Sequence, residues 1–124
     1  MALDVLIVDD SAAIRKILQR VLMQAEVPLG TVHEANDGQE ALAKLNGEKV
    51  GLILSDIYMP NMDGISFLKA VKQTNYKFTP IIMLTTESQE SKKQEGKEAG
   101  AKAWVVKPFK PEQLLAAIQK LILP

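Results

Sequence analysis

Short apolar runs alternate with expected helices along the whole chain, and this alternation limits the possible folds more than any other feature. Five runs have the length and composition of strands: Leu6–Val8, Thr31–Ala35, Leu52–Ser55, Ile81–Leu84 and Trp104–Val106. Alternating strands and helices are typical of βα units that build a parallel sheet. With 47% apolar residues, the chain has enough apolar surface to fill a core on both faces of such a sheet. We therefore predict an α/β fold of five strands and five helices that fills residues 1–124.

The first and last expected helices carry the clearest apolar stripes. In both, large apolar residues recur at steps of three and four, at Ile14, Ile17, Leu18, Val21, Leu22 and Ala25 in the first and at Leu114, Leu115, Ile118, Leu121 and Ile122 in the last. This spacing places them on one face of a helix, ready to cover the sheet. Pro28 and Gly30 should stop the first helix, and Pro111 suits the first turn of the last.

The sequence also predicts a second and a fourth helix, and the fourth is the unusual one. The second should cover Glu40–Leu45 and follow a turn at Asp37 and Gly38. The fourth, Ser88–Glu98, has no large apolar residue and contains Gly96. Glycine inside a helix costs roughly 1 kcal/mol relative to alanine. We expect this fourth helix to be the least stable of the five.

Polar residues suited to phosphate or cation chemistry follow four of the apolar runs. Asp9 and Asp10 follow the first run, Asp56 the third, Thr85 the fourth and Lys107 the fifth. The carboxyl ends of parallel strands gather at one edge of an open sheet, where ligands bind. We therefore expect three carboxylates, a hydroxyl and an ammonium group to meet there.

These groups together suggest metal-assisted phosphoryl transfer. Converging carboxylates repel one another unless a cation lies among them, and purely oxygen ligands favour Mg²⁺. Asp9 and Asp10 are the expected metal ligands, and Asp56 is the candidate nucleophile because a carboxylate can form an acyl phosphate. Lys107 would neutralise one phosphate oxygen, and Thr85 would donate a hydrogen bond to another.

Each residue alone also has a purely structural interpretation. Asp10 and the following serine suit a helix N-cap, Asp56 a strand-end turn, Thr85 a cap of the fourth helix, and Lys107 a solvated position. Four such groups at four strand ends favour a functional site over coincidence. His33, the only histidine, lies in an expected strand away from this edge, and we interpret it as structural or surface.

The bulk composition narrows the class of protein. The formal net charge is zero, which argues against a nucleic-acid partner or an anionic membrane surface. The chain has no cysteine, which excludes disulfides and thiolate metal sites. Its first residues lack the pattern of a secretory signal. We expect a cytoplasmic protein that binds neither DNA nor a membrane.

These motifs resemble the receiver domain of two-component response regulators over essentially the whole chain. The matching segments are Val8–Ser11, Asp56–Gly64, Met83–Thr85, Ala99–Ala101 and Val106–Phe109. No output domain follows within the 124 residues, so the chain is most similar to the single-domain, chemotaxis-type (CheY-like) regulators. The resemblance implies a flavodoxin-like (βα)5 three-layer sandwich with a parallel sheet of strand order 2-1-3-4-5.

The resemblance also implies a role for each acidic residue. Asp56 would be the phosphorylated aspartate. Asp10 and Asp56 would bind Mg²⁺ directly, and Asp9 mainly through water. Tyr58 would contribute only its backbone carbonyl to the metal.

The same resemblance assigns the phosphoryl contacts and a conformational switch. Thr85 and Lys107 would contact the phosphoryl group, with a cis peptide between Lys107 and Pro108. In the family, the hydroxyl moves inward on phosphorylation and an aromatic side chain of the fifth strand turns into the space it leaves. Here Trp104 holds that position, where tyrosine or phenylalanine is more usual. Because indole is large, we keep a fixed, half-buried tryptophan as the alternative.

The implied function is regulation by phosphorylation rather than enzymatic turnover of a substrate, although the domain would catalyse its own phosphorylation and dephosphorylation. A histidine kinase of the CheA type would supply the phosphoryl group. A surface of the fourth helix, fifth strand and fifth helix would bind a target such as a flagellar motor switch or a phosphatase. We expect a monomer. We also expect a bulky Tyr58 to hinder the attacking water and lengthen the phosphorylated lifetime.

Three alternatives follow from the same residues. A standalone receiver in a phosphorelay or another pathway would have an identical active site. A phosphatase of the haloacid dehalogenase type would need a carboxylate where Tyr58 stands. A flavin-binding module would need a phosphate-binding loop after the first strand. Asp9 and Asp10 stand at that position, and their carboxylates would repel a phosphate.

Overall fold

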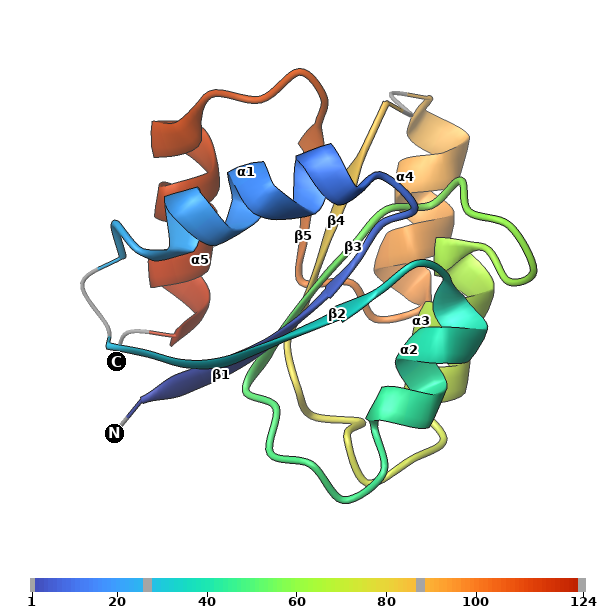
Figure 1. The fold of residues 1–124 in the computed structure, drawn as a ribbon. Coiled ribbons are helices and arrows are strands. Elements are labelled where there is room, and N and C mark those ends of the chain that lie inside the picture. The colour runs from blue at the N-terminus through green and yellow to red at the C-terminus, as the bar shows by residue number, and fades with distance from the viewer. Residues whose placement is uncertain (1, 26–27, 87–88, 123–124) are drawn as a thin grey trace.

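Five parallel strands form a central sheet with helices on both faces (Figure 1), in a computed structural model that describes residues 2–25, 28–86 and 89–122. In chain order the elements are β1 Leu3–Val8, α1 Ala12–Leu22, β2 Leu29–Ala35, α2 Gly38–Lys44, β3 Leu52–Ser55, α3 Gly64–Val71, β4 Ile81–Thr85, α4 Glu90–Glu98, β5 Ala103–Val106 and α5 Pro111–Ile122. The strand order is β2-β1-β3-β4-β5. The predicted fold class and strand order are therefore confirmed.

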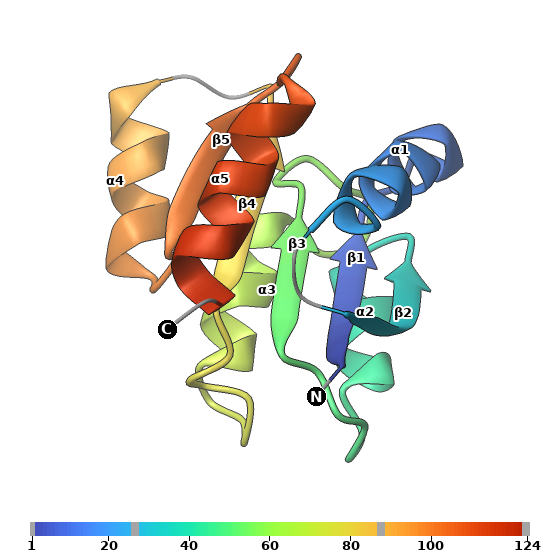
Figure 2. The ribbon, with the colours of Figure 1, turned by 90° about the vertical axis from the view of Figure 1, so that its left-hand side faces the viewer.

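The strands run in the same direction, so their carboxyl ends share one edge of the sheet (Figure 2). Val8 pairs with Ser55 across β1 and β3, and Thr85 pairs with Val106 across β4 and β5. The residues that follow these pairs therefore emerge side by side. The order reverses beside β1, and ligands bind at such a switch point in open α/β sheets.

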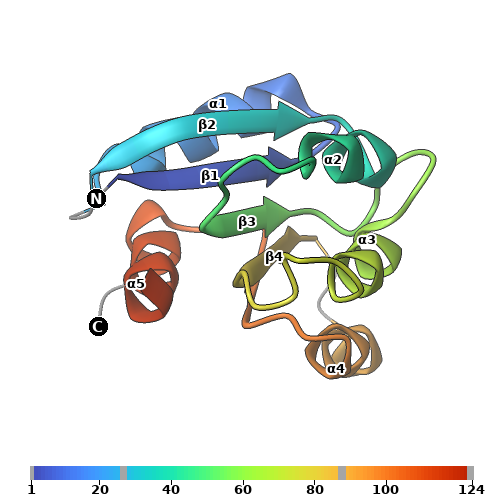
Figure 3. The same cartoon turned by 90° about the horizontal axis from the view of Figure 1, so that it is seen from below.

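The helices form one layer on each face of the sheet (Figure 3). α1 and α5 cover one face of the sheet, where their apolar stripes pack on β1, β3, β4 and β5. α2, α3 and α4 lie over the other face, which is filled mainly by α3 and includes the fully buried Phe67. All four residues of β3 are buried, as expected for a strand covered on both sides.

The first helix is shorter than its sequence pattern suggested. α1 ends at Leu22, so Ala25 lies beyond the helix, and Ile17 is 43% exposed despite its place in the stripe. β2 begins at Leu29 and includes Gly30. The backbone N–H of Leu3 in β1 bonds the carbonyl of Pro28, and Leu3 pairs with Leu29, so β1 draws these residues into the sheet.

Asp37 and Gly38 begin α2 instead of forming a separate turn. Asp37 is the N-cap, and its Oδ1 accepts a hydrogen bond of 2.8 Å from the backbone N–H of Glu40. The aspartate satisfies one of the unpaired N–H groups that every helix start exposes. The predicted helix at Glu40–Leu45 therefore starts two residues earlier and ends at Lys44.

α4 starts at Glu90, whereas the predicted start at Ser88 lies outside the described residues. Gly96 is buried against the indole of Trp104: a Cβ at this position would lie 2.6 Å from Cζ3 of the ring. Glycine therefore permits a close approach of α4 to β5, and the low stability of α4 stays a prediction. Across the described residues, no helix has the length and apolar character needed to cross a membrane.

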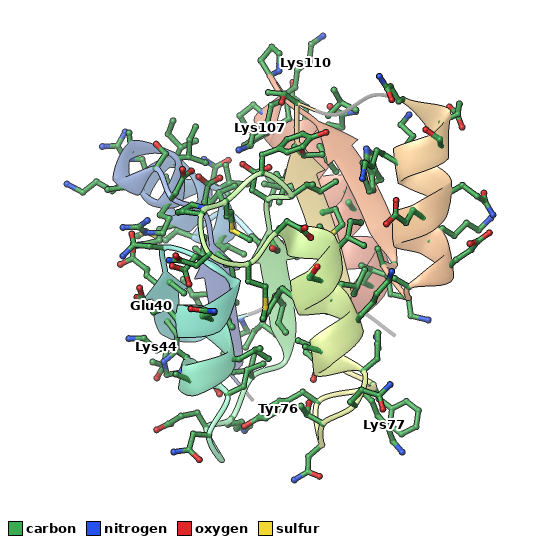
Figure 4. All side chains as sticks on the ribbon, turned by 90° about the vertical axis from the view of Figure 1, so that its right-hand side faces the viewer. Glu40, Lys44, Tyr76, Lys77, Lys107 and Lys110 are labelled. Atoms are coloured by element: carbon green, nitrogen blue, oxygen red, sulfur yellow. The ribbon has the colours of Figure 1, made fainter. Side chains whose placement is uncertain are left out.

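The loop between α3 and β4 lies at the end of the molecule opposite Lys107 (Figure 4). Tyr76 anchors this loop through a hydrogen bond of 2.7 Å from its hydroxyl to the carbonyl of Glu48. Phe78 projects from it with 86% of its surface exposed, beside the Lys77 ammonium at 5.3 Å from the ring centre.

Candidate functional site

Three carboxylates meet at the carboxyl edge of the sheet. Asp9, Asp10 and Asp56 each place one carboxylate oxygen within 4.8 Å of the others. Asp9 directly follows β1 and is buried, Asp56 follows β3 and is partly buried, and Asp10 is exposed. The predicted convergence of these residues is therefore observed, with a gradient from a buried carboxylate to an open one.

Lys107 supplies the positive charge of this cluster. Its Nζ lies 2.8 Å from Oδ2 of Asp9 and 3.2 Å from Oδ2 of Asp56. Burial by itself would lower the pKa of Lys107, but the hydrogen bond to Asp9 and the charges of both aspartates outweigh it and hold the pKa above its ordinary value. The side chain is therefore positively charged at neutral pH. The backbone N–H of Lys107 donates to the Thr85 carbonyl at 2.8 Å, and the Lys107–Pro108 peptide is cis, as the family resemblance implied.

The start of α1 fixes the buried aspartate. Ser11 is the N-cap of α1 and accepts a hydrogen bond of 3.3 Å from the N–H of Ile14. The N–H of Ser11 donates to Oδ1 of Asp9 at 2.9 Å. The helix cap thus belongs to Ser11, and the carboxylate of Asp10 lies at the surface of the cluster.

The backbone around Asp56 is closely packed. Oδ1 of Asp56 accepts a hydrogen bond of 2.7 Å from the N–H of Ile57, and the Asp56 N–H donates to the carbonyl of Val8 at 3.0 Å. Gly64 passes directly beneath: its N–H donates to the Ile57 carbonyl at 2.7 Å, and a Cβ there would lie 2.0 Å from the carbonyl oxygen of Asp56. Only glycine fits this crossing, a role that the sequence pattern did not reveal.

A second unpredicted contact holds the β3–α3 loop. Asn61 has a φ of 67°, a left-handed conformation that asparagine tolerates, and its Nδ2 donates to Oδ2 of Asp37 at 2.8 Å. The hydrogen bonds from the Glu40 N–H and from Asn61 hold the pKa of Asp37 below its ordinary value. The aspartate therefore joins the start of α2 to the loop that follows Asp56.

The remaining predicted residues surround the carboxylates. Thr85 ends β4 and is fully buried. Side chains alternate along a strand, so Thr85 shares a sheet face with Met83 and with its partner Trp104, which is partly buried. Thr85 and Trp104 are thus diagonal neighbours on one face of the sheet. The side chain of Tyr58, in the loop after Asp56, is 52% exposed.

The donor set suits a hard divalent cation. Carboxylate oxygens of Asp9, Asp10 and Asp56 converge at the carboxyl edge of the sheet. Mg²⁺ is bound in proteins by one or two carboxylates together with water and phosphate oxygens. Lys107 offsets only part of the negative charge, which leaves a net attraction for such an ion.

Comparison with known proteins identifies relatives of this chain. The response regulator receiver domain family matches residues 5–119. A crystal structure of the chemotaxis protein CheY4 of Vibrio cholerae is 49% identical, with a TM-score of 0.87 over 98% of this chain and 100% of that one. A chain in the CheX–CheY–BeF3–Mg²⁺ complex of Borrelia burgdorferi is 28% identical, with a TM-score of 0.89 over 98% of this chain and 90% of that chain.

A longer relative is also similar. The transcriptional regulatory protein SrrA of Staphylococcus aureus is 38% identical over 122 residues, which cover 98% of this chain and 48% of SrrA. The chain thus spans about half the length of the curated relatives that it matches.

Proposed function

The chain belongs to the response regulator receiver domain family, and we propose that it is a signalling switch in which a histidine kinase phosphorylates Asp56. The observation that carries this proposal is the convergence of Asp9, Asp10 and Asp56 within 4.8 Å, with Lys107 bound to two of them. Such a cluster is costly for folding alone, because like charges repel, and it fits a site that receives a cation and a phosphoryl group.

In the proposed reaction, a carboxylate oxygen of Asp56 attacks the phosphorus of a phosphohistidine. A P–O bond forms, the P–N bond breaks, and the imidazole nitrogen leaves with the electron pair. Water later attacks the same phosphorus and releases inorganic phosphate and the free carboxylate. The purpose of the cycle is regulation, so the domain acts on itself and is not an enzyme for an external substrate.

The residues around Asp56 have complementary parts in this reaction. Asp10, Asp56 and the Tyr58 carbonyl would hold Mg²⁺, with Asp9 acting mainly through water. The metal, when bound, supplies positive charge to the transferring phosphoryl group. Lys107, already 3.2 Å from the Asp56 carboxylate, is close enough to bind a phosphoryl oxygen there.

The output follows from the added charge. A phosphoryl group adds negative charge beside Lys107 and Thr85, and Thr85 is the diagonal neighbour of Trp104. Movement of Thr85 would release Trp104 and shift α4, which changes the surface formed by α4, β5 and α5. This surface would then bind its target in one phosphorylation state only.

The proposed pathway is chemotaxis or flagellar control, with a CheA-like kinase and a motor-switch or phosphatase target. The 49% identity to Vibrio cholerae CheY4 over nearly the full length supports it. The second candidate is a receiver in another pathway, such as control of transcription, because the SrrA match covers the chain equally well. Binding of a flagellar motor-switch protein, measured with and without beryllofluoride and Mg²⁺, separates the two.

The central assignment is tested by intact mass after incubation with Mg²⁺ and acetyl phosphate. Wild type should gain one phosphate, Asp56→Ala should gain none, and Asp63→Asn, an aspartate outside the cluster, should behave as wild type. An adduct on both wild type and Asp56→Ala, or on neither, would refute the assignment. Trp104 is the only tryptophan, so its fluorescence gives a second readout of coupling between the site and β5.

A further inference from the structure

Arg15 joins three separate parts of the chain behind the acidic cluster. It lies in the first turn of α1, and its side chain is only 13% exposed. Its Nε lies 2.9 Å from Oε1 of Glu34 in β2, and its Nη1 donates to Oδ1 of Asn36 at 3.1 Å. The same Nη1 donates to the backbone carbonyl of Asp9.

The bond to Asp9 completes the restraint of this residue. The Asp9 N–H donates to the Ala35 carbonyl at 3.1 Å, so the preceding peptide is fixed by β2. The Asp9 carbonyl belongs to the next peptide, the one that leads into Asp10, and Arg15 holds it. The direction in which the exposed Asp10 carboxylate leaves the backbone depends on the orientation of that peptide.

The guanidinium group is itself held in place. Glu34 and Asn36 orient Arg15 from one side, and Asn36 donates through Nδ2 to Oε2 of Glu40 in α2 at 3.1 Å. Planar guanidinium donors in a fixed fork can serve several acceptors at once, whereas a lysine ammonium on a flexible stem cannot reproduce that geometry. A simple ion pair with Glu34, whose side chain is 43% exposed, would contribute little by itself.

We infer that Arg15 is a positioning residue for the cation site. It orients the Asp9–Asp10 peptide so that the Asp10 carboxylate converges with that of Asp56, and it acts through Asp9 without touching the ion. This inference rests on the proposed function, because it concerns the Mg²⁺ that the cluster would bind. It assigns to α1 a part in metal affinity in addition to its packing on the sheet.

The test is the affinity of the purified protein for Mg²⁺, measured by calorimetry without any phosphodonor. Arg15→Lys keeps the positive charge but loses the planar guanidinium donors, and Arg15→Met loses both the charge and the donors. Both variants should bind Mg²⁺ about 10-fold more weakly, as is usual when a residue that orients a metal ligand is lost. Lys16→Met removes the same charge from the next, exposed position of α1 and should retain wild-type affinity.

Two further measurements separate positioning from folding and from the proposed function. Thermal unfolding in EDTA identifies the temperature range in which each variant is fully folded, and affinities are compared there. In the acetyl phosphate assay, the Arg15 variants should need more Mg²⁺ for half-maximal labelling yet reach the wild-type maximum.

Wild-type affinity in either folded Arg15 variant would overturn the inference while leaving the phosphorylation of Asp56 intact. An equal loss in Lys16→Met would overturn it too, because charge alone would then explain the effect. If wild type bound no Mg²⁺, both the inference and the proposed metal site would fail.

Discussion

The acidic edge of the sheet and the face formed by α4 and β5 are built in opposite ways. At the edge, Asp9 is fixed by hydrogen bonds from the Ser11 N–H and from Lys107, and Asp56 by the Ile57 N–H and Lys107. On the α4–β5 face, a mainly apolar groove is lined by Trp104 and two alanines together with three exposed or partly exposed lysines, Lys93, Lys97 and Lys102.

The two regions also differ in what stabilises their helices. α1, α2 and α3 begin with side-chain caps from Ser11, Asp37 and Asp63. α4 carries i,i+3 ion pairs of 3.4 and 3.9 Å whose side chains are at least one-third exposed, and such pairs contribute little. Gly96 of α4 packs tightly against Trp104. A change of charge at a rigid site is therefore expected to appear as movement where the structure is least restrained.

The largest expected effect tests the rigidity of the acidic edge. Gly64→Ala places a Cβ within 2.0 Å of the Asp56 carbonyl oxygen, a clash with backbone that no side-chain rotation relieves. We expect a loss of about 3 kcal/mol or more in the free energy of unfolding, measured in urea. Gly51→Ala is the control, because its Cβ would meet the flexible tip of Leu3 at 3.1 Å and the Asp4 carbonyl oxygen at an ordinary contact distance of 3.7 Å. Equal losses in both variants would contradict the rigid crossing.

The next effect tests the tight contact between α4 and β5. Gly96→Ala should gain up to about 1 kcal/mol in helix propensity. The clash with the Trp104 ring at 2.6 Å should outweigh this gain and leave a net loss of about 1 kcal/mol. In a Trp104→Ala background the same substitution should become stabilising. The same loss in both backgrounds, determined from urea unfolding as a double-mutant cycle, would show that the two residues are not coupled.

Access of water to Asp56 is the third point of comparison. Tyr58 lies in the loop directly after Asp56 and is half exposed, which motivates our hypothesis that it hinders the attacking water. Tyr58→Asn should dephosphorylate roughly threefold to tenfold faster, equivalent to at most about 1.4 kcal/mol of barrier. The measurement is the decay of the phosphorylated mass after removal of the phosphodonor. An unchanged or slower decay in the variant would contradict the hypothesis.

The cost of the acidic cluster is the fourth point of comparison. Asp10→Asn removes one of three carboxylates that lie within 4.8 Å of one another. In EDTA the variant should be more stable by about 1 kcal/mol, the repulsion of two unit charges 4 Å apart in water. Its Mg²⁺ affinity should fall at the same time. A variant that is less stable than wild type in EDTA would show that Asp10 serves folding rather than the cation.

The smallest effect concerns the contact between α2 and the β3–α3 loop. The pKa of Asp37 lies below its ordinary value of 3.8, so its ionised form stabilises the fold at neutral pH. This contribution is complete above pH 3.8 and is lost as the pH falls through the lower pKa of the folded state. The stability difference between wild type and Asp37→Asn should therefore shrink on acidification below that point. A difference that is constant from neutral to strongly acidic pH would exclude this titration.

The strand ends were predictable because their signal is local. An apolar run followed by a polar residue marks the end of a buried strand, and the parallel arrangement then brings Asp9, Asp56 and Lys107 together. The strand order came from the family resemblance, since alternation of elements alone does not specify it.

The unpredicted features depend on residues distant in the sequence. Arg15 meets Glu34 across 19 positions, and Asn61 meets Asp37 across 24. Gly96 interrupts the helical sequence pattern of α4. Glycine is needed there because the indole of Trp104 lies against it once α4 packs on β5. Such contacts arise from the packing of the folded chain, and the periodicity of the sequence does not predict them.

The exposed Phe78 gives this protein a natural place for a reporter. Its neighbours Tyr76 and Lys77 lie at the end opposite Lys107 (Figure 4), and the chain contains no cysteine. Phe78→Cys would therefore create a unique thiol for a fluorophore or for attachment to a sensor surface. A molecule tethered there would present its acidic edge to solution, so kinase binding can be followed on an immobilised sample.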